Sequence, residues 1–117
     1  MELKLTAHLS YIDKYNKLKF TYIDGTDIDK LKYHCERSTE RSTERGEDIG
    51  KKILPYNDDD FTVSFDPIYR KDMEAFIGLD CNIRVKLCVY NFISKLSRNK
   101  GDKVQGVRLI LTDIQRI

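Results

Sequence analysis

The last third of the chain, Ile83–Ile117, constrains the fold most because it alternates apolar and polar residues over two long stretches. In the first stretch every second residue from Ile83 to Val89 is aliphatic. The positions between them carry Arg84, Lys86, Cys88 and Tyr90. Successive side chains of a strand point to opposite faces, so the pattern predicts a strand with one aliphatic face and one basic, aromatic face, which Phe92 extends.

A basic loop separates this strand from a second one. The loop spans Ser94–Lys103, is rich in turn-forming residues, and carries the cations Lys95, Arg98, Lys100 and Lys103. The second strand is predicted over residues 104–113, where aliphatic residues fill one face and Arg108 lies on the other. The two strands together predict a long hairpin with a basic tip.

Three further strands are predicted upstream of the hairpin. Apolar residues alternate with polar ones from Leu3 to Tyr11, and a turn then leads to a returning strand over Leu18–Ile23. Phe61–Phe65 alternates in the same way and predicts a third strand. The segment Ile28–Cys35 fits either a helix or a short strand, and both interpretations stay open.

A long polar insertion is predicted over residues 36–60. It contains the tetrapeptide Arg-Ser-Thr-Glu twice in succession, at Arg37–Glu40 and Arg41–Glu44. A segment so poor in apolar residues buries too little surface to offset the entropy that it loses on ordering, so we expect a flexible, solvated loop. If the segment were helical instead, Arg37, Arg41 and Arg45 would lie near one face.

One helix is predicted between the third and fourth strands. Asp66 is a suitable N-cap, Pro67 occupies the first helical position, and Gly78 is placed to end the helix in a left-handed conformation. We expect Met73, Phe76 and Ile77 to be buried. With the insertion set aside, the order of elements is that of the OB-fold, a small five-stranded barrel. The sequence therefore predicts one mainly β domain over residues 1–117.

The closing residues resemble the end of viral and phage single-stranded DNA-binding proteins of the OB type. The resemblance covers roughly the last third of the chain. It rests on the stretches Val85-Lys86-Leu87, Tyr90-Asn91-Phe92, Lys100-Gly101 and Gly106–Leu111, followed by Ile114. In that family a strand with basic and aromatic residues precedes a Gly-Val strand. This chain lacks the acidic C-terminal tail of the fuller members, and it ends at Gln115-Arg116-Ile117.

These features predict a protein that binds single-stranded nucleic acid without catalysing a reaction, with DNA favoured and RNA left open. Cations would contact phosphates, and aromatic rings would stack on exposed bases. The predicted binding residues are Arg84, Lys86, Tyr90, Phe92, Lys95, Arg98, Lys100, Lys103 and Arg108. The ordinary alternative for this face is a solvated sheet surface. The net charge of +2 is too small to decide between them.

The other function classes receive less support. No catalytic motif, metal-ligand spacing or cofactor fingerprint is present, so we expect no enzyme activity, metal or cofactor. Three cysteines without a CxxC pair indicate reduced thiols and an intracellular location, in the cytoplasm or nucleus of a host cell if the protein is viral. No apolar run is long enough for a membrane span. A structural or adaptor domain that binds protein is the alternative function, and homo-oligomer formation stays open.

Overall fold

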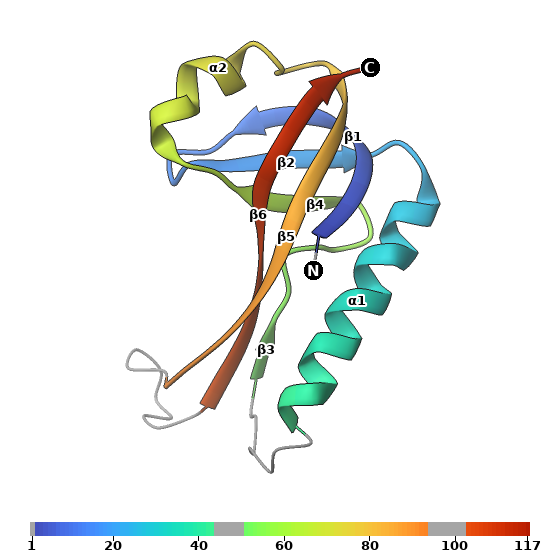
Figure 1. The fold of residues 1–117 in the computed structure, drawn as a ribbon, viewed down its shortest axis with the longest axis vertical. Coiled ribbons are helices and arrows are strands. Elements are labelled where there is room, and N and C mark those ends of the chain that lie inside the picture. The colour runs from blue at the N-terminus through green and yellow to red at the C-terminus, as the bar shows by residue number, and fades with distance from the viewer. Residues whose placement is uncertain (1, 44–50, 94–102) are drawn as a thin grey trace.

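The fold is a β-barrel with one long helix at its side and one short helix at its end (Figure 1). The structure, a computed structural model, describes residues 2–43, 51–93 and 103–117. Its elements in chain order are β1 (Glu2–Ile12), β2 (Lys17–Tyr22), α1 (Gly25–Thr43), β3 (Lys51–Ile53), β4 (Asp60–Ser64), the 3-10 helix η1 (Pro67–Tyr69), α2 (Arg70–Glu74), β5 (Asp80–Ile93) and β6 (Lys103–Arg116).

Five of the strands pair in a closed ring. The ring runs β1–β2–β4–β6–β5 and returns to β1, and all of its pairs are antiparallel except β4–β6. The first strand of the ring therefore pairs with the second and the fourth, and the third pairs with the fifth. This is the pairing of an OB-fold. The predicted mainly β fold, with a helix between the third and fourth barrel strands, is confirmed.

The barrel core follows from the alternation seen in the sequence. Every second residue of β1 from Leu3 to Leu9 is buried, and these residues pack in one cluster with inward residues of β2, β4 and β5. At the centre, Phe20 of β2 lies opposite Phe61 of β4, and their rings stack with centroids 5.3 Å apart. Both phenylalanines are fully buried. The polar residues that alternate with the buried residues along each strand consequently form the outer surface of the barrel.

Helix α1 is longer than the sequence predicts, so the prediction of a flexible polar loop over residues 36–60 is wrong in part. Residues 36–43 continue the helix and residues 51–53 form β3, whereas residues 44–50 lie outside the described part. Leu31, Cys35 and Thr39 recur at four-residue spacing and are buried, which gives α1 one packed face. The Thr39 hydroxyl donates to the Cys35 carbonyl at 3.0 Å, so the first copy of the repeat contributes to this face.

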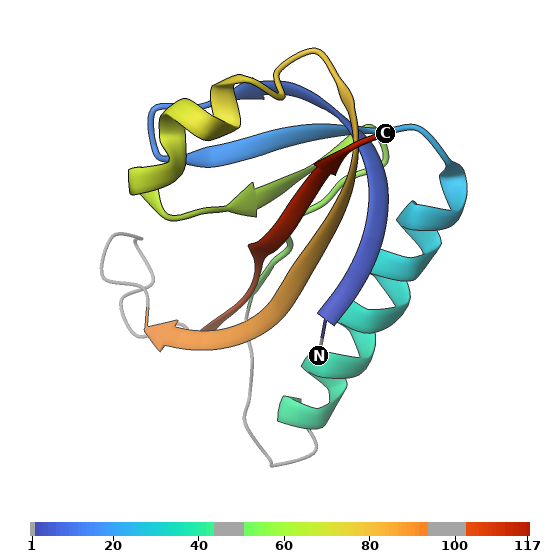
Figure 2. The same cartoon turned by 45° about the horizontal axis from the view of Figure 1, so that its top comes forward.

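Helix α1 also covers an open edge of β1 (Figures 1 and 2). Residues 3–6 of β1 pair with β5 on one side only, because β2 joins β1 at Ala7. Side chains of α1 bond to the exposed backbone instead: the Thr6 amide donates to Asp27 at 2.9 Å, and Lys30 donates to the Lys4 carbonyl at 2.8 Å. Backbone groups left without partners in a sheet edge are costly, so these bonds fix the N-terminal half of α1 against the barrel.

The predicted helix after β4 forms as η1 followed by the single turn of α2. Asp66 caps it by accepting from the Ile68 amide at 3.1 Å, and Gly78 has a φ of 82°, as the sequence predicts. Met73 is buried in the core, and Phe76 packs against the core while partly buried. The prediction that Ile77 is buried is wrong, since 42% of its surface is exposed. The helix ends too early to turn this side chain inward.

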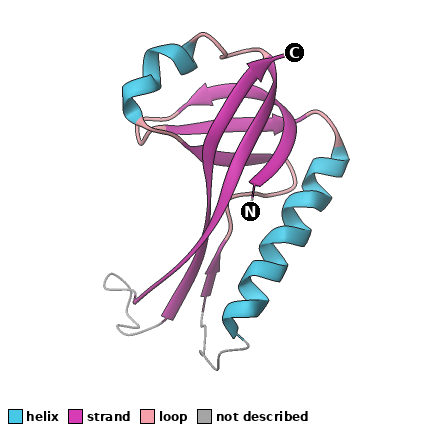
Figure 3. Cartoon of the chain, in the orientation of Figure 1, coloured by secondary structure: helices cyan, strands magenta, loops and turns pink. Residues whose placement is uncertain are grey.

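Strands β5 and β6 continue past the barrel as a long ribbon (Figure 3). Their pairing extends to Ile93 opposite Lys103, and β3 joins the far end of β6 in a parallel pair. The ribbon therefore carries residues from the barrel wall out toward the tip. This position brings the outward residues of β5 and β6 beside the outer surface of β2 and β4.

Candidate nucleic-acid interface

The polar face of the β5–β6 ribbon is directed outward from the barrel core. Ile83 and Val85 of β5 are buried, whereas Arg84 between them and Lys86 after them are exposed. The register places Lys86 opposite Ile110, Cys88 opposite Arg108 and Tyr90 opposite Gly106. Directly opposed residues share a face. Arg84, Lys86, Tyr90 and Arg108 thus all lie on the outer side of the ribbon.

Tyr90, Gly106 and Arg108 form one packed unit on this face. The Tyr90 ring crosses the neighbouring strand at Gly106, where a Cβ atom would overlap the ring carbons and the hydroxyl. The Arg108 guanidinium lies over the same ring, with Cζ 5.3 Å from the ring centroid. A glycine at position 106 is therefore required for the ring to lie close to the strand. The contacts hold an aromatic ring and a cation together at the surface.

Tyr90 and Arg108 line a groove on the barrel wall, which we name the barrel groove. Its volume is about 200 Å³, and its other walls come from the outer surface of β2 and β4 and from the connection after β3. Its lining residues are Asp13, Lys17, Lys19, Ile53, Leu54, Pro55, Thr62, Ser64, Tyr90, Val107, Arg108 and Leu109. β2 and β4 are the second and third strands of the barrel, and OB-folds commonly bind oligonucleotides on that face.

Two lysines of the barrel groove were missed by the sequence analysis. Lys17 and Lys19 alternate with the buried Leu18 and Phe20, so they point outward from β2. Lys17 lies opposite Ser64 and Lys19 opposite Thr62, whose hydroxyl accepts from the Lys19 amine at 2.8 Å. The alternation was visible in the sequence. What the sequence did not show is that β2 lies on the same groove as β5 and β6.

The turn between β1 and β2, whose Asp13 lines this groove, carries an exposed aromatic ring. Asp13 accepts from the backbone amides of Tyr15 and Lys17, at 2.8 and 3.1 Å, and so fixes the turn. The Tyr15 ring is 69% exposed, and the Lys14 amine lies 5.1 Å from its centroid. This tyrosine between two lysines was also missed, although the local pattern Lys-Tyr-Asn-Lys was a usable signal.

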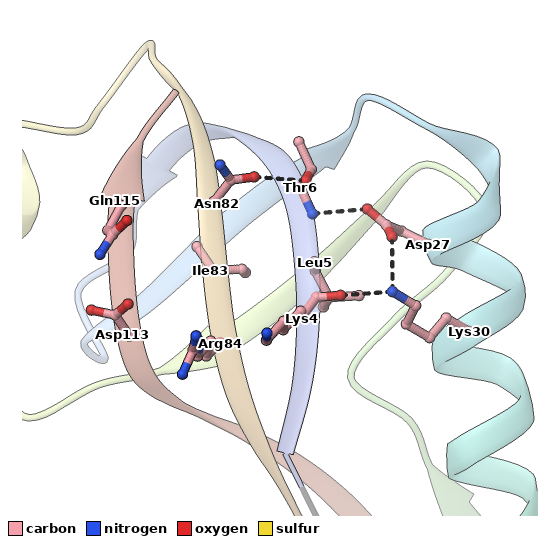
Figure 4. Close-up of a pocket in the computed structure, with 10 residues that line it drawn as sticks. All are labelled: Lys4, Leu5, Thr6, Asp27, Lys30, Asn82, Ile83, Arg84, Asp113 and Gln115. Atoms are coloured by element: carbon pink, nitrogen blue, oxygen red, sulfur yellow. Dashed lines mark hydrogen bonds and ion pairs between the residues drawn. The ribbon is translucent and has the colours of Figure 1, made fainter.

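Arg84 lines a different cavity, which we name the outer hollow (Figure 4). Its volume is about 340 Å³, and it lies over β1, β5 and β6 beside the start of α1. Its lining residues are Lys4, Leu5, Thr6, Asp27, Lys30, Asn82, Ile83, Arg84, Asp113 and Gln115. Lys86 lines neither cavity. The structure therefore brings Tyr90 and Arg108 together and places Arg84 in a separate hollow.

The remaining predicted residues lie at or beyond the limits of the described chain. Phe92 belongs to β5 and Lys103 to β6, but their side chains are outside the described part. Lys95, Arg98 and Lys100 lie wholly outside the described residues. Their predicted part in binding stays a prediction.

Burial keeps two thiols and a tyrosine near the core protonated. Burial, aided by the neighbouring Glu36, raises the pKa of Cys35 to about 12, and burial also raises the pKa of Cys81. Both thiols therefore stay protonated at neutral pH. Burial likewise raises the pKa of Tyr22, with a smaller contribution from Asp60. Within the described ranges, no group of three or more His, Cys, Asp or Glu side chains is placed to hold a metal ion.

Comparison with known proteins gives a structural likeness and no match in sequence. No protein-family model matches the sequence, and no curated protein matches it either. Among solved structures, the chain is similar to a crystal structure of the mitochondrial single-stranded DNA-binding protein Rim1 of S. cerevisiae. The TM-score is 0.49 and the identity 12%, with 99% of this chain and 91% of that chain covered. The assignment of the barrel rests on the strand pairing and not on this likeness. In the described part of the chain, no helix is long and apolar enough to cross a membrane.

Proposed function

We propose that this protein binds single-stranded nucleic acid in the barrel groove and catalyses no reaction. The observation that carries the proposal is the Tyr90–Arg108 pair, held over Gly106 at the border of a groove that also contains Lys17 and Lys19. Lysine and arginine bind phosphates, and an aromatic or guanidinium plane stacks on a base. The groove offers both kinds of contact within one binding face.

The same arrangement favours single strands over duplexes. A base lies flat on a ring or a guanidinium plane only when it is unstacked and accessible, which is the normal state of a single strand. Neither contact reads a base sequence through defined hydrogen bonds, so binding should tolerate many sequences. We propose DNA as the preferred strand, on the strength of the family resemblance of the last third of the chain, with RNA as the alternative.

Further parts of the proposal concern the setting of the protein. We propose an intracellular location, where exposed strands occur and where the three free cysteines stay reduced. A viral origin and a part in replication rest on the resemblance alone.

An adaptor that binds protein is the second candidate function, and one observation favours it. The 3-10 helix η1 exposes Ile68 by 75% and Tyr69 by 51%, which places two large apolar side chains in solvent. Exposed apolar surface is a common feature of protein interfaces. Affinity for a protein through this surface should change little with salt, whereas affinity for phosphates should fall steeply as salt rises.

A chemical footprint at Cys88 tests the location of binding. Cys88 lies opposite Arg108 on the outer face and is partly exposed, whereas Cys35 and Cys81 are fully buried. A neutral maleimide should therefore modify Cys88 first, and a saturating single strand should slow this modification. The measurement is the rate of labelling at Cys88, followed by mass spectrometry.

The control for this footprint is a cysteine on α2, outside the β5–β6 ribbon that carries Cys88. In a Cys88→Ser background, a Lys71→Cys variant places a thiol on α2, and Lys71 is exposed and lines neither cavity. The single strand should leave its labelling rate unchanged. If the strand binds and Cys88 reacts as fast as in the free protein, the strand is bound elsewhere and the proposed interface is wrong.

A further inference from the structure

Two cations face each other across the outer hollow. Lys4 of β1 lies directly opposite Arg84 of β5 in the antiparallel register. Like charges in directly opposed positions destabilise a sheet. Neither side chain forms an ion pair with any described residue. On the other side of β5, Asp113 of β6 lies directly opposite Arg84, and Asp27 lies 3.9 Å from the Lys30 amine. With three cations and two carboxylates among its lining residues, the hollow keeps one positive charge in excess.

Asn82, which lines the hollow beside these cations, keeps hydrogen-bond donors that its bond to Thr6 does not use. The Thr6 hydroxyl donates to the Asn82 side-chain oxygen at 2.9 Å, which leaves the Asn82 amide nitrogen to donate elsewhere (Figure 4). Asp27 accepts from the Thr6 amide and lies 3.9 Å from the Lys30 amine, so its charge is directed to the edge of β1. Asp113 is the other carboxylate of the hollow. The excess of donors suits a phosphate group.

The hollow is linked to the barrel groove by a row of outward residues. The strand register places Lys17, Ser64, Ile110 and Lys86 in one row across β2, β4, β6 and β5. Lys86 and Arg84 are two residues apart on one face of β5, which is about 6.6 Å along the strand. Cations at such steps can follow successive phosphates of an extended strand.

We infer that the outer hollow is a second phosphate-binding site, which takes a phosphate of the same single strand that the barrel groove binds. This inference rests on the proposed function. Lys4 and Arg84 contact the phosphate, the Asn82 amide donates to it, and Lys86 lies on the path between the two sites. A strand long enough to reach both sites gains these contacts, and a strand that fills only the groove does not.

The test compares two strand lengths with a double variant, Lys4→Gln with Arg84→Gln. OB-folds bind about 4–16 nucleotides each, so strands of about 4 and about 16 nucleotides represent the two cases. For the longer strand, the double variant should bind several-fold more weakly and lose about 1.4 from the salt slope, at about 0.7 for each lost contact. For the shorter strand, the affinity of the variant should equal that of the parent.

A matched variant controls for net charge. Lys32→Gln with Lys71→Gln removes the same two charges from exposed positions that line neither cavity. It should bind both strands like the parent. Thermal unfolding of each variant checks that the fold is kept. Nuclear magnetic resonance of the Asn82 side-chain amide gives a readout without mutation: the longer strand should shift its resonance, and the shorter one should not.

The outcomes separate this inference from the proposed function. If the parent binds no single strand, both are overturned. If the parent binds and Tyr90→Ala weakens binding of both strands, while the Lys4 and Arg84 variant binds the longer strand like the parent, only the second site is overturned. A shift of the Asn82 resonance with inorganic phosphate but not with the longer strand would mean that the hollow takes a free anion, which also overturns it.

Discussion

Replacing Phe61 with alanine should lower the free energy of unfolding by about 3–5 kcal/mol. Phe61 is fully buried, and it packs against the Phe20 ring at 5.3 Å and the Tyr22 ring at 5.2 Å. The substitution removes a large apolar side chain from the centre of the barrel, and the surrounding strands are fixed by their ladders and relax only in part. Urea unfolding measures the loss as a lower midpoint with an unchanged slope.

An exposed side chain provides the comparison. Ile68→Ala removes apolar atoms from a position that is 75% exposed, so it should change the unfolding free energy by no more than about 0.5 kcal/mol. Equal stability losses for Phe61→Ala and Ile68→Ala would mean that the barrel core is not where the strand pairing places it.

Replacing Tyr90 with alanine should weaken binding of a single strand by about 1–3 kcal/mol, or roughly 5- to 150-fold. The variant loses both the ring and the surface against which the Arg108 guanidinium lies. Tyr90→Phe keeps the ring and should bind nearly as tightly as the parent. The measurement is the dissociation constant of a labelled single strand, with thermal unfolding as the check on folding.

A second substitution tests the same contact without touching the ring. Gly106→Ala adds one methyl group at the point where the Tyr90 ring crosses β6, so the ring must move away from its place beside Arg108. Gly106→Ala should therefore weaken single-strand binding although it removes no atom from the ligand side. Tight binding by folded Tyr90→Ala protein would contradict the role of the ring. Tight binding by folded Gly106→Ala protein would contradict the role of its position.

The strands of the barrel were predictable because side-chain burial and side-chain hydrophobicity alternate with the same period of two residues. The alternation in β1, β2, β4 and β5 sorts inward from outward residues without knowledge of the fold. Helix α1 was not predictable beyond Cys35, because its packed face there is one threonine, Thr39, in a repeat of charged and hydroxyl residues. Strand β3 has three residues, two of them lysines, and its pairing with β6 is set by tertiary structure.

The candidate site was predictable only along a single ribbon. The sequence places Arg84, Lys86 and Tyr90 on one side of β5, and the structure agrees. That Arg84 lines one cavity and Tyr90 another depends on how the ribbon is joined to β1 at one end and to the groove at the other. Lys17 and Lys19 reach the groove because the ring closes through β4, a pairing between segments more than forty residues apart. Local periodicity carries no information on such closure.

The most direct test of single-strand binding is an anisotropy titration of a labelled strand of about 16 nucleotides and of its duplex, from about 50 to about 200 mM salt. We expect saturable binding of the single strand and weaker binding of the duplex. The logarithm of the affinity should fall linearly with the logarithm of the salt concentration, with a slope of about −2 to −3.5 for three to five phosphate contacts. Absence of single-strand binding at the lowest salt, or duplex binding of equal strength, would contradict the proposed function.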